Sequence, residues 1–394
     1  MRLQHIEDFR APTEPPPAFT LFELGFRPFY LAAALWAVMA LPLWLAELHG
    51  HAWRDGGGGS AWHAHEMLFG FAGAAIAGFA MTAVRNWTQQ PTPRGVWLAA
   101  LLLLWLGGRA GYLFAWPAGA VCDLAFLPAV AVAIGRNVVR ARQWRNVFLP
   151  ALMLLLGLAN AAFYWFADDA AMTSLTIRIA LFLVLMIEIA VAGRVIPGFT
   201  ANAVPGVKPL RHPWLDRVAI GSTHSSFVLA CLPVPGLLTA AVALVAALAQ
   251  ATRLIGWKPW LSRRSPILWV LHLAYAWIVV GLLLLAAAEL DWIALSASLH
   301  AFAVGATAGL IVGMMTRTAR GHTGRPVRAG AFEVAAYALI AAAALVRVAV
   351  ALVPAIPFLP GLDLAATLWC LGFALFVGRF AAWLARPRAD GLPG

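Results

Sequence analysis

Long apolar runs recur from one end of this sequence to the other, and they restrict the fold more than any other feature. A helix needs about 20 apolar residues to cross the hydrocarbon core of a bilayer. Only helices and closed barrels satisfy their backbone in lipid, and these runs are too long and too apolar for barrel strands. The composition, 62% hydrophobic and 11% charged, fits no soluble globular class. The sequence therefore predicts an all-α, polytopic membrane helical bundle.

About twelve transmembrane helices are predicted from length and hydropathy. Pro233 and Pro235 make the seventh and eighth the least regular of them. Residues 21–388 form a single predicted transmembrane domain, and the Pro-rich residues 1–20 form a predicted disordered tail. The predicted spans are 27–46, 63–84, 95–114, 119–139, 147–167, 174–197, 215–233, 236–253, 266–288, 293–316, 330–353 and 361–385.

The basic residues indicate how the spans are oriented. Most of the 28 Lys and Arg residues fall in alternate loops, whereas the opposite loops carry Arg54 with Asp168, Asp169, Glu289 and Asp291. Cytoplasmic loops of membrane proteins are enriched in Lys and Arg, so both termini are predicted to be cytoplasmic. The net charge of +11 follows from this topology, and no nucleic-acid partner is predicted.

Five histidines are candidate metal ligands because of where they fall in the predicted spans. Ionisable groups inside a membrane are costly and mark functional sites by default, and imidazole is the commonest metal ligand. His63, His65 and His300 form a predicted outer group, and His272 and His322 form a predicted inner group. The alternative is a histidine that only bonds a neighbouring carbonyl.

For one further histidine, His224 in the seventh predicted span, the preferred interpretation is that it only bonds a neighbouring carbonyl. His63 and His65 are two residues apart, so on a regular helix they point about 200° apart. We therefore expect them to serve different partners unless His63 lies in a frayed first turn. Glu66 follows directly, but Phe69 stands where a zinc-protease motif needs a second histidine.

Our working hypothesis is that His65 and His300 face one another across two spans and hold a metal, with His63 beside them. His272 and His322 would complete a second site nearer the cytoplasm.

Several charged residues near the ends of spans are candidate cofactor contacts. Arginine pairs bidentately with carboxylates, so arginines at this depth suit haem propionates. The alternative for each arginine is ordinary positive-inside topology. A buried carboxylate, Glu188, would relay protons or pair with Arg178 or Arg194. The cofactor-binding candidates are Arg27, Arg85, Arg194, Arg317, Arg325 and Glu66.

Seven short strings in order along the chain carry a resemblance to a known family. They are Leu24–Phe29, Trp62–Phe71, Asn86–Thr88, Gly193–Pro197, Leu271–Trp277, Leu299–Ala301 and Met315–Arg317 with Gly321–Pro326. Together they resemble the NnrS family, haem- and copper-containing membrane proteins associated with bacterial responses to nitric oxide. The five candidate histidines are all present. The chain departs from the family pattern at Arg85 (where Pro is expected), Gln89 (Gly) and Ala201 (a basic residue).

The resemblance implies haem b and copper as cofactors, nitric oxide as a ligand, and a multi-pass protein of the bacterial inner membrane that protects against nitrosative stress. A nitric-oxide-converting oxidoreductase would also need an electron donor, and no donor site is evident. The alternative function is a membrane transporter of haem, copper or a small anion, with a histidine-lined pathway. Transporters are often built from repeats, and no convincing repeat relates residues 1–200 to residues 201–394.

Overall fold

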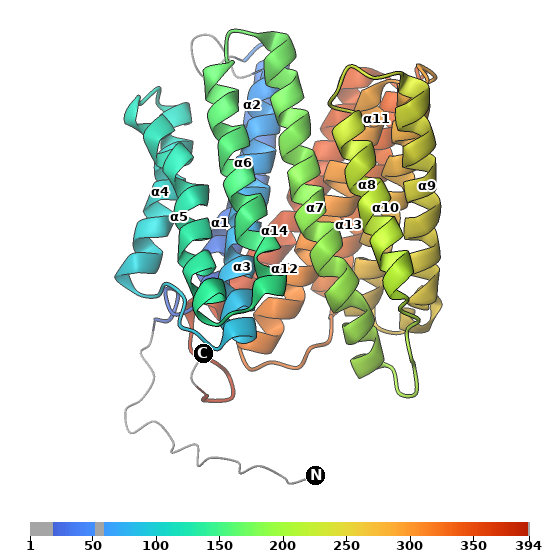
Figure 1. The fold of residues 1–394 in the computed structure, drawn as a ribbon. Coiled ribbons are helices and arrows are strands. Elements are labelled where there is room, and N and C mark those ends of the chain that lie inside the picture. The colour runs from blue at the N-terminus through green and yellow to red at the C-terminus, as the bar shows by residue number, and fades with distance from the viewer. Residues whose placement is uncertain (1–18, 52–58, 393–394) are drawn as a thin grey trace.

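The computed structural model describes residues 19–51 and 59–392, and within these ranges it is a bundle of helices with no strand (Figure 1). Its elements are α1 (Phe26–Leu48), α2 (Gly59–His65), η1 (Glu66–Ala72), α3 (Gly73–Thr88), α4 (Val96–Leu113), α5 (Ala118–Arg140), η2 (Trp144–Asn146), α6 (Phe148–Trp165), α7 (Ala170–Ala203), α8 (Pro213–Leu229), α9 (Gly236–Gly256), η3 (Pro259–Ser262), α10 (Pro266–Glu289), α11 (Leu295–His300), η4 (Ala301–Ala308), α12 (Gly309–His322), α13 (Ala331–Leu352) and α14 (Phe358–Ala385). Nearly all of the predicted tail, and Arg54, lie outside the described residues.

Eleven helices in the described part of the chain are long and apolar enough to cross a membrane. The prediction of about twelve differs at α8, which has 17 residues, one fewer than the shortest of the eleven. Helix α8 still runs antiparallel to α7 and α9 (Figure 1). Together with the eleven, α8 brings the described part of the chain to twelve passes. Pro235 lies in the turn that separates α8 from α9 rather than inside a helix. The fold is therefore the predicted polytopic helical bundle.

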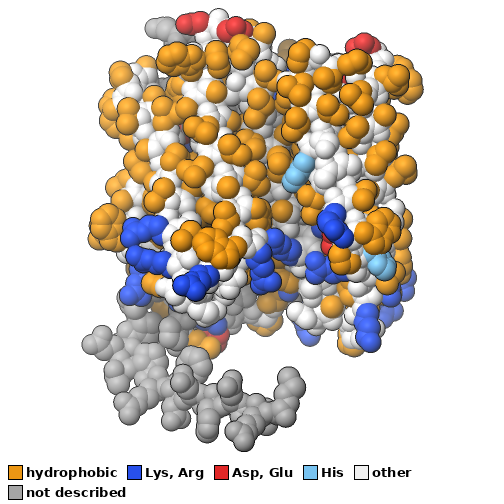
Figure 2. All heavy atoms as spheres, viewed as in Figure 1, with side chains coloured by type: hydrophobic (Ala, Val, Ile, Leu, Met, Phe, Trp, Pro, Cys, Tyr) orange, Lys and Arg blue, Asp and Glu red, His pale blue; other side chains and the backbone are white. Residues whose placement is uncertain are grey.

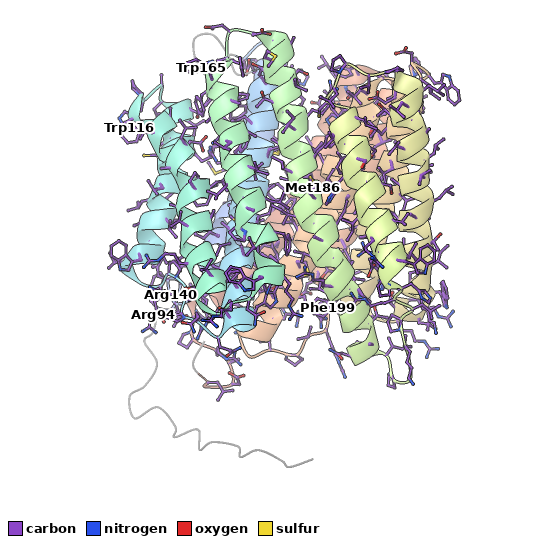
Figure 3. The ribbon with its side chains drawn as sticks, in the orientation of Figure 1. Arg94, Trp116, Arg140, Trp165, Met186 and Phe199 are labelled. Atoms are coloured by element: carbon purple, nitrogen blue, oxygen red, sulfur yellow. The ribbon has the colours of Figure 1, made fainter. Side chains whose placement is uncertain are left out.

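The two ends of the bundle differ in charge. On the visible face, Lys and Arg gather toward one end and Asp and Glu mainly at the other, with apolar side chains between them (Figure 2). Trp116 and Trp165 lie toward the acidic end, and Arg94 and Arg140 lie toward the basic end (Figure 3). Tryptophan enrichment at the membrane interface and basic residues at one end are typical of a bilayer-spanning bundle.

The twelve passes pack as three groups of four. Helices α1 to α5 form the first group, α6 to α9 the second and α10 to α14 the third. Consecutive groups join in the same way, through α5 on α6, α9 on α10 and α14 on α1. The second pass of each group lies innermost, and these passes are the most buried spans: Gly59–Thr88 (89%), Ala170–Ala203 (72%) and Leu295–His322 (67%). Near the basic end of each, a threonine hydroxyl (Thr88, Thr200 and Thr323) donates to the carbonyl four residues earlier.

The first and third groups also share sequence, which corrects the expectation that no repeat exists. Identical residues recur at one constant spacing between the two inner passes and the loops that follow them. The repeat escapes notice in the sequence because the identities are sparse and because the loop before each inner pass differs in length. The pairs are His65 and His300, Gly70 and Gly305, Ile76 and Ile311, Gly78 and Gly313, Arg85 and Arg320, Thr88 and Thr323, Pro91 and Pro326, and Gly95 and Gly330.

Matched packing contacts support the repeat independently of the sequence identities. A Cβ added to Gly70 would lie 2.6 Å from Trp36 Nε1 of α1, and one added to Gly305 would lie 2.3 Å from Trp277 Cδ2 of α10. Glycine at these positions lets neighbouring helices approach closely. Because α1 and α10 occupy equivalent places, the same contact is made twice in the molecule.

A second matched feature lies at the acidic end of these two inner passes. Both contain a π-helical segment, η1 directly after His65 and η4 directly after His300. Such insertions are rare and occur frequently at functional sites. They direct attention to the histidines that precede them.

Candidate functional site

A cavity of about 740 Å³ opens near the acidic end between α1, the α2–η1 pass, α7, the α11–η4 pass, α13 and α14. We call it the acidic-end cavity. Most of its lining is apolar, as in sites that bind drug-sized ligands or cofactors. Its polar lining includes two of the five predicted histidines, His63 and His300. Its lining also includes Trp44, Met67, Phe71, Asp168, Arg178, Leu181, Ser296, Arg347 and Trp369.

The ring of His300 is oriented by a backbone group. Its Nδ1 lies 2.7 Å from the carbonyl oxygen of Ser296, one turn earlier in α11, and 3.2 Å from the Ser296 hydroxyl. A carbonyl can only accept, so Nδ1 carries the proton and donates, which leaves the lone pair on Nε2. Metal-binding histidines are usually held in this way, with one ring nitrogen donating to a carbonyl or carboxylate.

His63 is held by stacking rather than by a hydrogen bond. Its ring lies 4.1 Å from the ring of Trp44 in α1 at an interplanar angle of 15°. Its Nδ1 is buried and has no hydrogen-bond partner among the described residues. Buried polar atoms are nearly always paired, so an unpaired ring nitrogen beside a cavity is a candidate ligand-binding atom.

Two arginines that were not predicted as cofactor contacts line the same cavity. Arg347 of α13 donates to the Ser296 hydroxyl (3.3 Å), and Arg178 of α7 donates to the carbonyl of Ala230 (2.8 Å). The Arg178 Nε is buried without a hydrogen-bond partner in the described part of the chain. The one carboxylate among the described lining residues is that of Asp168. The cavity therefore combines apolar walls, two imidazoles and two cations.

His65 faces away from this cavity, so the expected pairing of His65 with His300 is wrong. Its fully buried ring lies among aromatic rings of η1, α4 and α6, including Phe163 at 4.6 Å. His65 Nδ1 donates to Glu66 Oε1 (2.9 Å), and His65 Nε2 donates to Asn160 Oδ1 (2.9 Å). The two-residue spacing does place His63 and His65 on different partners, as predicted. It is His63 that shares a cavity with His300.

His65 belongs to a buried ionic cluster made by four passes of the first two groups. Arg109 of α4 pairs with Asp123 of α5, and its Nε lies 2.9 Å from Glu66 Oε2. Asp123 Oδ2 accepts from Asn160 (2.9 Å) and lies 3.2 Å from His65 Nε2. Both ring nitrogens of His65 face acceptors, as in a doubly protonated imidazolium. The cluster then balances two positive charges against two negative ones.

The structure does not bring His272 and His322 into one site. The Thr200 hydroxyl lies 3.0 Å from His272 Nε2, while His272 Nδ1 is buried and unpaired among the described residues. His322 packs against Phe26 (5.5 Å between ring centroids) and lines a separate cavity at the basic end. Among the described residues, no three or more His, Cys, Asp or Glu side chains form a group that could hold a metal ion.

Four of the five predicted arginines have protein partners. The fully buried Arg27 donates to the carbonyls of Leu384 and Arg386 (2.9 Å each) and so fixes the end of α14. The others are Arg194, which donates to Asn146 (2.8 Å), Arg317, which lies 3.7 Å from the Phe199 ring centroid, and Arg325, which lies 4.2 Å from that of Trp383. Arg85 lines the separate cavity at the basic end that His322 also lines.

Glu188 pairs with neither of the arginines considered for it. Its Oε2 accepts from the hydroxyl of Thr307 (2.9 Å), and its Oε1 is buried without a partner among the described residues. The carboxyl group lines a small, mostly apolar cavity between the inner passes. Thr307 also lines the acidic-end cavity, so this contact lies between the two.

Four residues important to these sites were not predicted as site residues: Arg109, Asp123, Arg178 and Arg347. Each lies within a predicted span, and charge at such a depth is itself a signal of function or of a buried partner. Arg109 and Asp123 fall in neighbouring spans, so their pairing was open to prediction. The direction in which Arg178 and Arg347 point depends on helix packing.

No curated protein matches this chain. A model of the NnrS protein family matches residues 20–388, which is nearly the whole chain. The match includes every pass, all three cavities and the buried ionic cluster. The chain therefore belongs to the NnrS family.

Proposed function

We propose that the acidic-end cavity is a haem and copper centre that binds or converts nitric oxide and protects the cell against nitrosative stress. The observation that carries the proposal is that His63 and His300 open into one largely apolar cavity of about 740 Å³. The family to which the chain belongs is one of the nitric-oxide response, which supports this choice of ligand.

His300 is the proposed ligand of haem iron. Its Nδ1 is committed to the Ser296 carbonyl, so Nε2 is available to a metal and the ring cannot turn freely. Arg178 and Arg347 are the proposed partners of the haem propionates, in place of the arginines predicted from the sequence, because they line the same cavity. When bound, haem would supply an iron with a position open to nitric oxide.

His63 and Met67 are the proposed copper ligands. They lie four residues apart and both line the cavity that His300 also lines. Thioether is a soft donor that suits Cu(I), and imidazole is a common ligand of copper. The chain's own contribution is to hold the proposed haem ligand, His300, and the proposed copper ligands, His63 and Met67, around one cavity and to keep water out with an apolar lining.

The proposed location is the bacterial inner membrane with the basic end in the cytoplasm. The acidic-end cavity would then lie near the periplasmic face, where nitric oxide arrives through the lipid. If the centre turns over, electrons come from a donor that neither the sequence nor the bundle identifies.

The test is metal analysis of purified variants, with absorption spectra of the oxidised and reduced protein. We expect iron, copper and a Soret band in the wild type, loss of haem in His300→Ala, and loss of copper with retained haem in His63→Ala. His224→Ala, which changes a histidine outside the cavity, should retain both metals. A folded wild-type protein without iron and copper would contradict the proposal.

The repeat gives the transporter alternative new support, because parallel repeats related by an axis along the membrane normal occur in transporters. The metal analysis separates the two functions. A transporter pathway would leave a folded, metal-free protein, and substitution of His63 or His300 would change uptake by vesicles rather than a spectrum.

A further inference from the structure

A second large cavity, of about 550 Å³, lies at the basic end of the bundle. We call it the basic-end cavity. It is formed by the end of α3, the loop to α4, the segment before α1, the end of α12 and the chain after α14. The residues that line it are Glu23, Leu24, Thr82, Arg85, Asn86, Gln89, Gln90, Pro91, Thr92, Arg94, His322 and Arg388.

The repeat supplies an internal comparison for this cavity. Arg320 of the third group is equivalent to Arg85 of the first, and its guanidinium donates to Glu333 Oε1 from Nε (2.9 Å) and Nη2 (2.5 Å). The residue equivalent to Glu333 in the first group is Leu98, which is fully buried and apolar. Arg320 is therefore neutralised by Glu333, whereas Arg85 has an apolar residue, Leu98, at the position equivalent to Glu333.

The remaining charges in the basic-end cavity do not replace that counterion. Arg85 and Arg94 are both exposed, and neither forms an ion pair with a carboxylate in the described ranges. Arg388 is partly neutralised by Asp390 (2.6 and 2.9 Å), and its hydrogen bonds lower the pKa of that carboxyl below the usual value. Glu23 is the one carboxylate among the described lining residues.

Neutral donors surround the unpaired arginines. The amides of Asn86, Gln89 and Gln90 and the hydroxyl of Thr92 line the cavity. Gln89 has a φ of 55°, a backbone conformation that side-chain-bearing residues rarely adopt and that its equivalent Gly324 adopts without cost. Guanidinium groups and amide donors together match a tetrahedral oxyanion.

Membrane topology explains why arginines lie at this end of the protein, but not their arrangement. Arg320 shows that the fold can neutralise such a residue with a buried carboxylate. In the basic-end cavity, by contrast, unpaired cations and amide donors line a concave site large enough for an organic ligand.

We propose that the basic-end cavity binds a phosphate ester through Arg85 and Arg94. The phosphate belongs either to the headgroup of an inner-leaflet phospholipid or to a soluble cytoplasmic compound, since both present the same chemistry to the arginines. This site lies at the opposite end of the bundle from the proposed metal centre and does not depend on it.

The test uses the full-length protein in dodecyl maltoside, a detergent without phosphate, and measures thermal unfolding. One arm adds sodium pyrophosphate at constant ionic strength. The other adds phosphatidylglycerol, with diacylglycerol of the same acyl chains as the reference. The variants are Arg85→Gln and Arg94→Gln, and the matched control is Arg328→Gln, an exposed arginine of the equivalent loop in the third group that does not line the cavity.

We expect one of the two phosphate compounds to raise the unfolding temperature of the wild type and of Arg328→Gln. Losing a hydrogen bond to a charged group costs about 1.5–3 kcal/mol, so Arg85→Gln and Arg94→Gln should each bind roughly tenfold or more weakly. A response to pyrophosphate assigns the site to a soluble phosphate compound, and a response to phosphatidylglycerol alone assigns it to a lipid headgroup.

Two results would overturn the proposal. One is no phosphate-dependent shift in either arm. The other is an equal loss of binding in Arg328→Gln, since that would mean diffuse attraction to the basic end. Iron and copper are counted on the same samples, so a failure of phosphate binding can be told apart from a failure of the proposed metal centre.

Discussion

The buried ionic cluster around His65 offers the sharpest test of how this bundle is held together. Arg109 is 2% exposed and contacts two carboxylates, those of Asp123 and Glu66. Methionine is close to arginine in length but carries no charge. Arg109→Met therefore leaves two buried carboxylates opposite the single positive charge of His65.

The expected cost follows from that imbalance. Removing one partner of a buried ion pair typically costs about 3–5 kcal/mol, because the remaining charge is left without compensation in a low-dielectric interior. Asp123→Asn creates the opposite imbalance and should cost about as much. The double variant restores neutrality, since Glu66 and His65 remain as a pair. We expect it to be more stable than the sum of the two single changes predicts, by roughly 2 kcal/mol or more.

The assay is reversible unfolding by sodium dodecyl sulfate in mixed micelles, applied to the wild type, both single variants and the double variant. Arg328→Met is the control for loss of an exposed arginine and should change stability by about 0.5 kcal/mol or less. Additive effects of Arg109→Met and Asp123→Asn, or a cost below about 1 kcal/mol for each, would show that the cluster is not energetically coupled.

Three further results are expected from the contacts described above. His65→Ala should destabilise the fold by about 2–4 kcal/mol in the same unfolding assay, because it leaves buried acceptors unpaired. The folded fraction of His65→Ala should still bind its metals, whereas His63→Ala should lose copper. Gly305→Ala should cost about 1–3 kcal/mol from overpacking, whereas Gly221→Ala, whose added Cβ would meet nothing within 4 Å, should not destabilise; equal costs would contradict the close contact. Glu333→Ala should lower the thermal unfolding temperature by leaving the buried charge of Arg320 without its carboxylate partner, and an unchanged temperature would show that this pair contributes nothing.

Much of the fold was predictable because it depends on local properties of the sequence. Span lengths and the alternation of charge are read directly from composition along the chain, and the helices follow them. The prediction was least accurate at α8, where hydropathy and proline give competing signals. Pro213 is the first residue of this helix, and the helix ends before the Pro-rich turn that contains Pro235. The repeat was missed for a related reason. A contact such as Trp36 with Gly70 is recognised as a repeated contact only when its counterpart is seen in space.

By itself, the sequence determined that the chain is a polytopic helical bundle, and it predicted how the passes are oriented and at what depth each histidine lies. Helical periodicity also separated His63 from His65, since residues two apart cannot share one direction. Only the tertiary structure decided which of the two faces His300, because that depends on how α2 is rotated against α1, α6 and α7. The same packing brought Arg109, Asp123 and Asn160 around His65 and left Arg85 without the counterion that its equivalent Arg320 has. Hydropathy places a residue along the membrane normal, but its rotation about that normal is set by neighbouring helices.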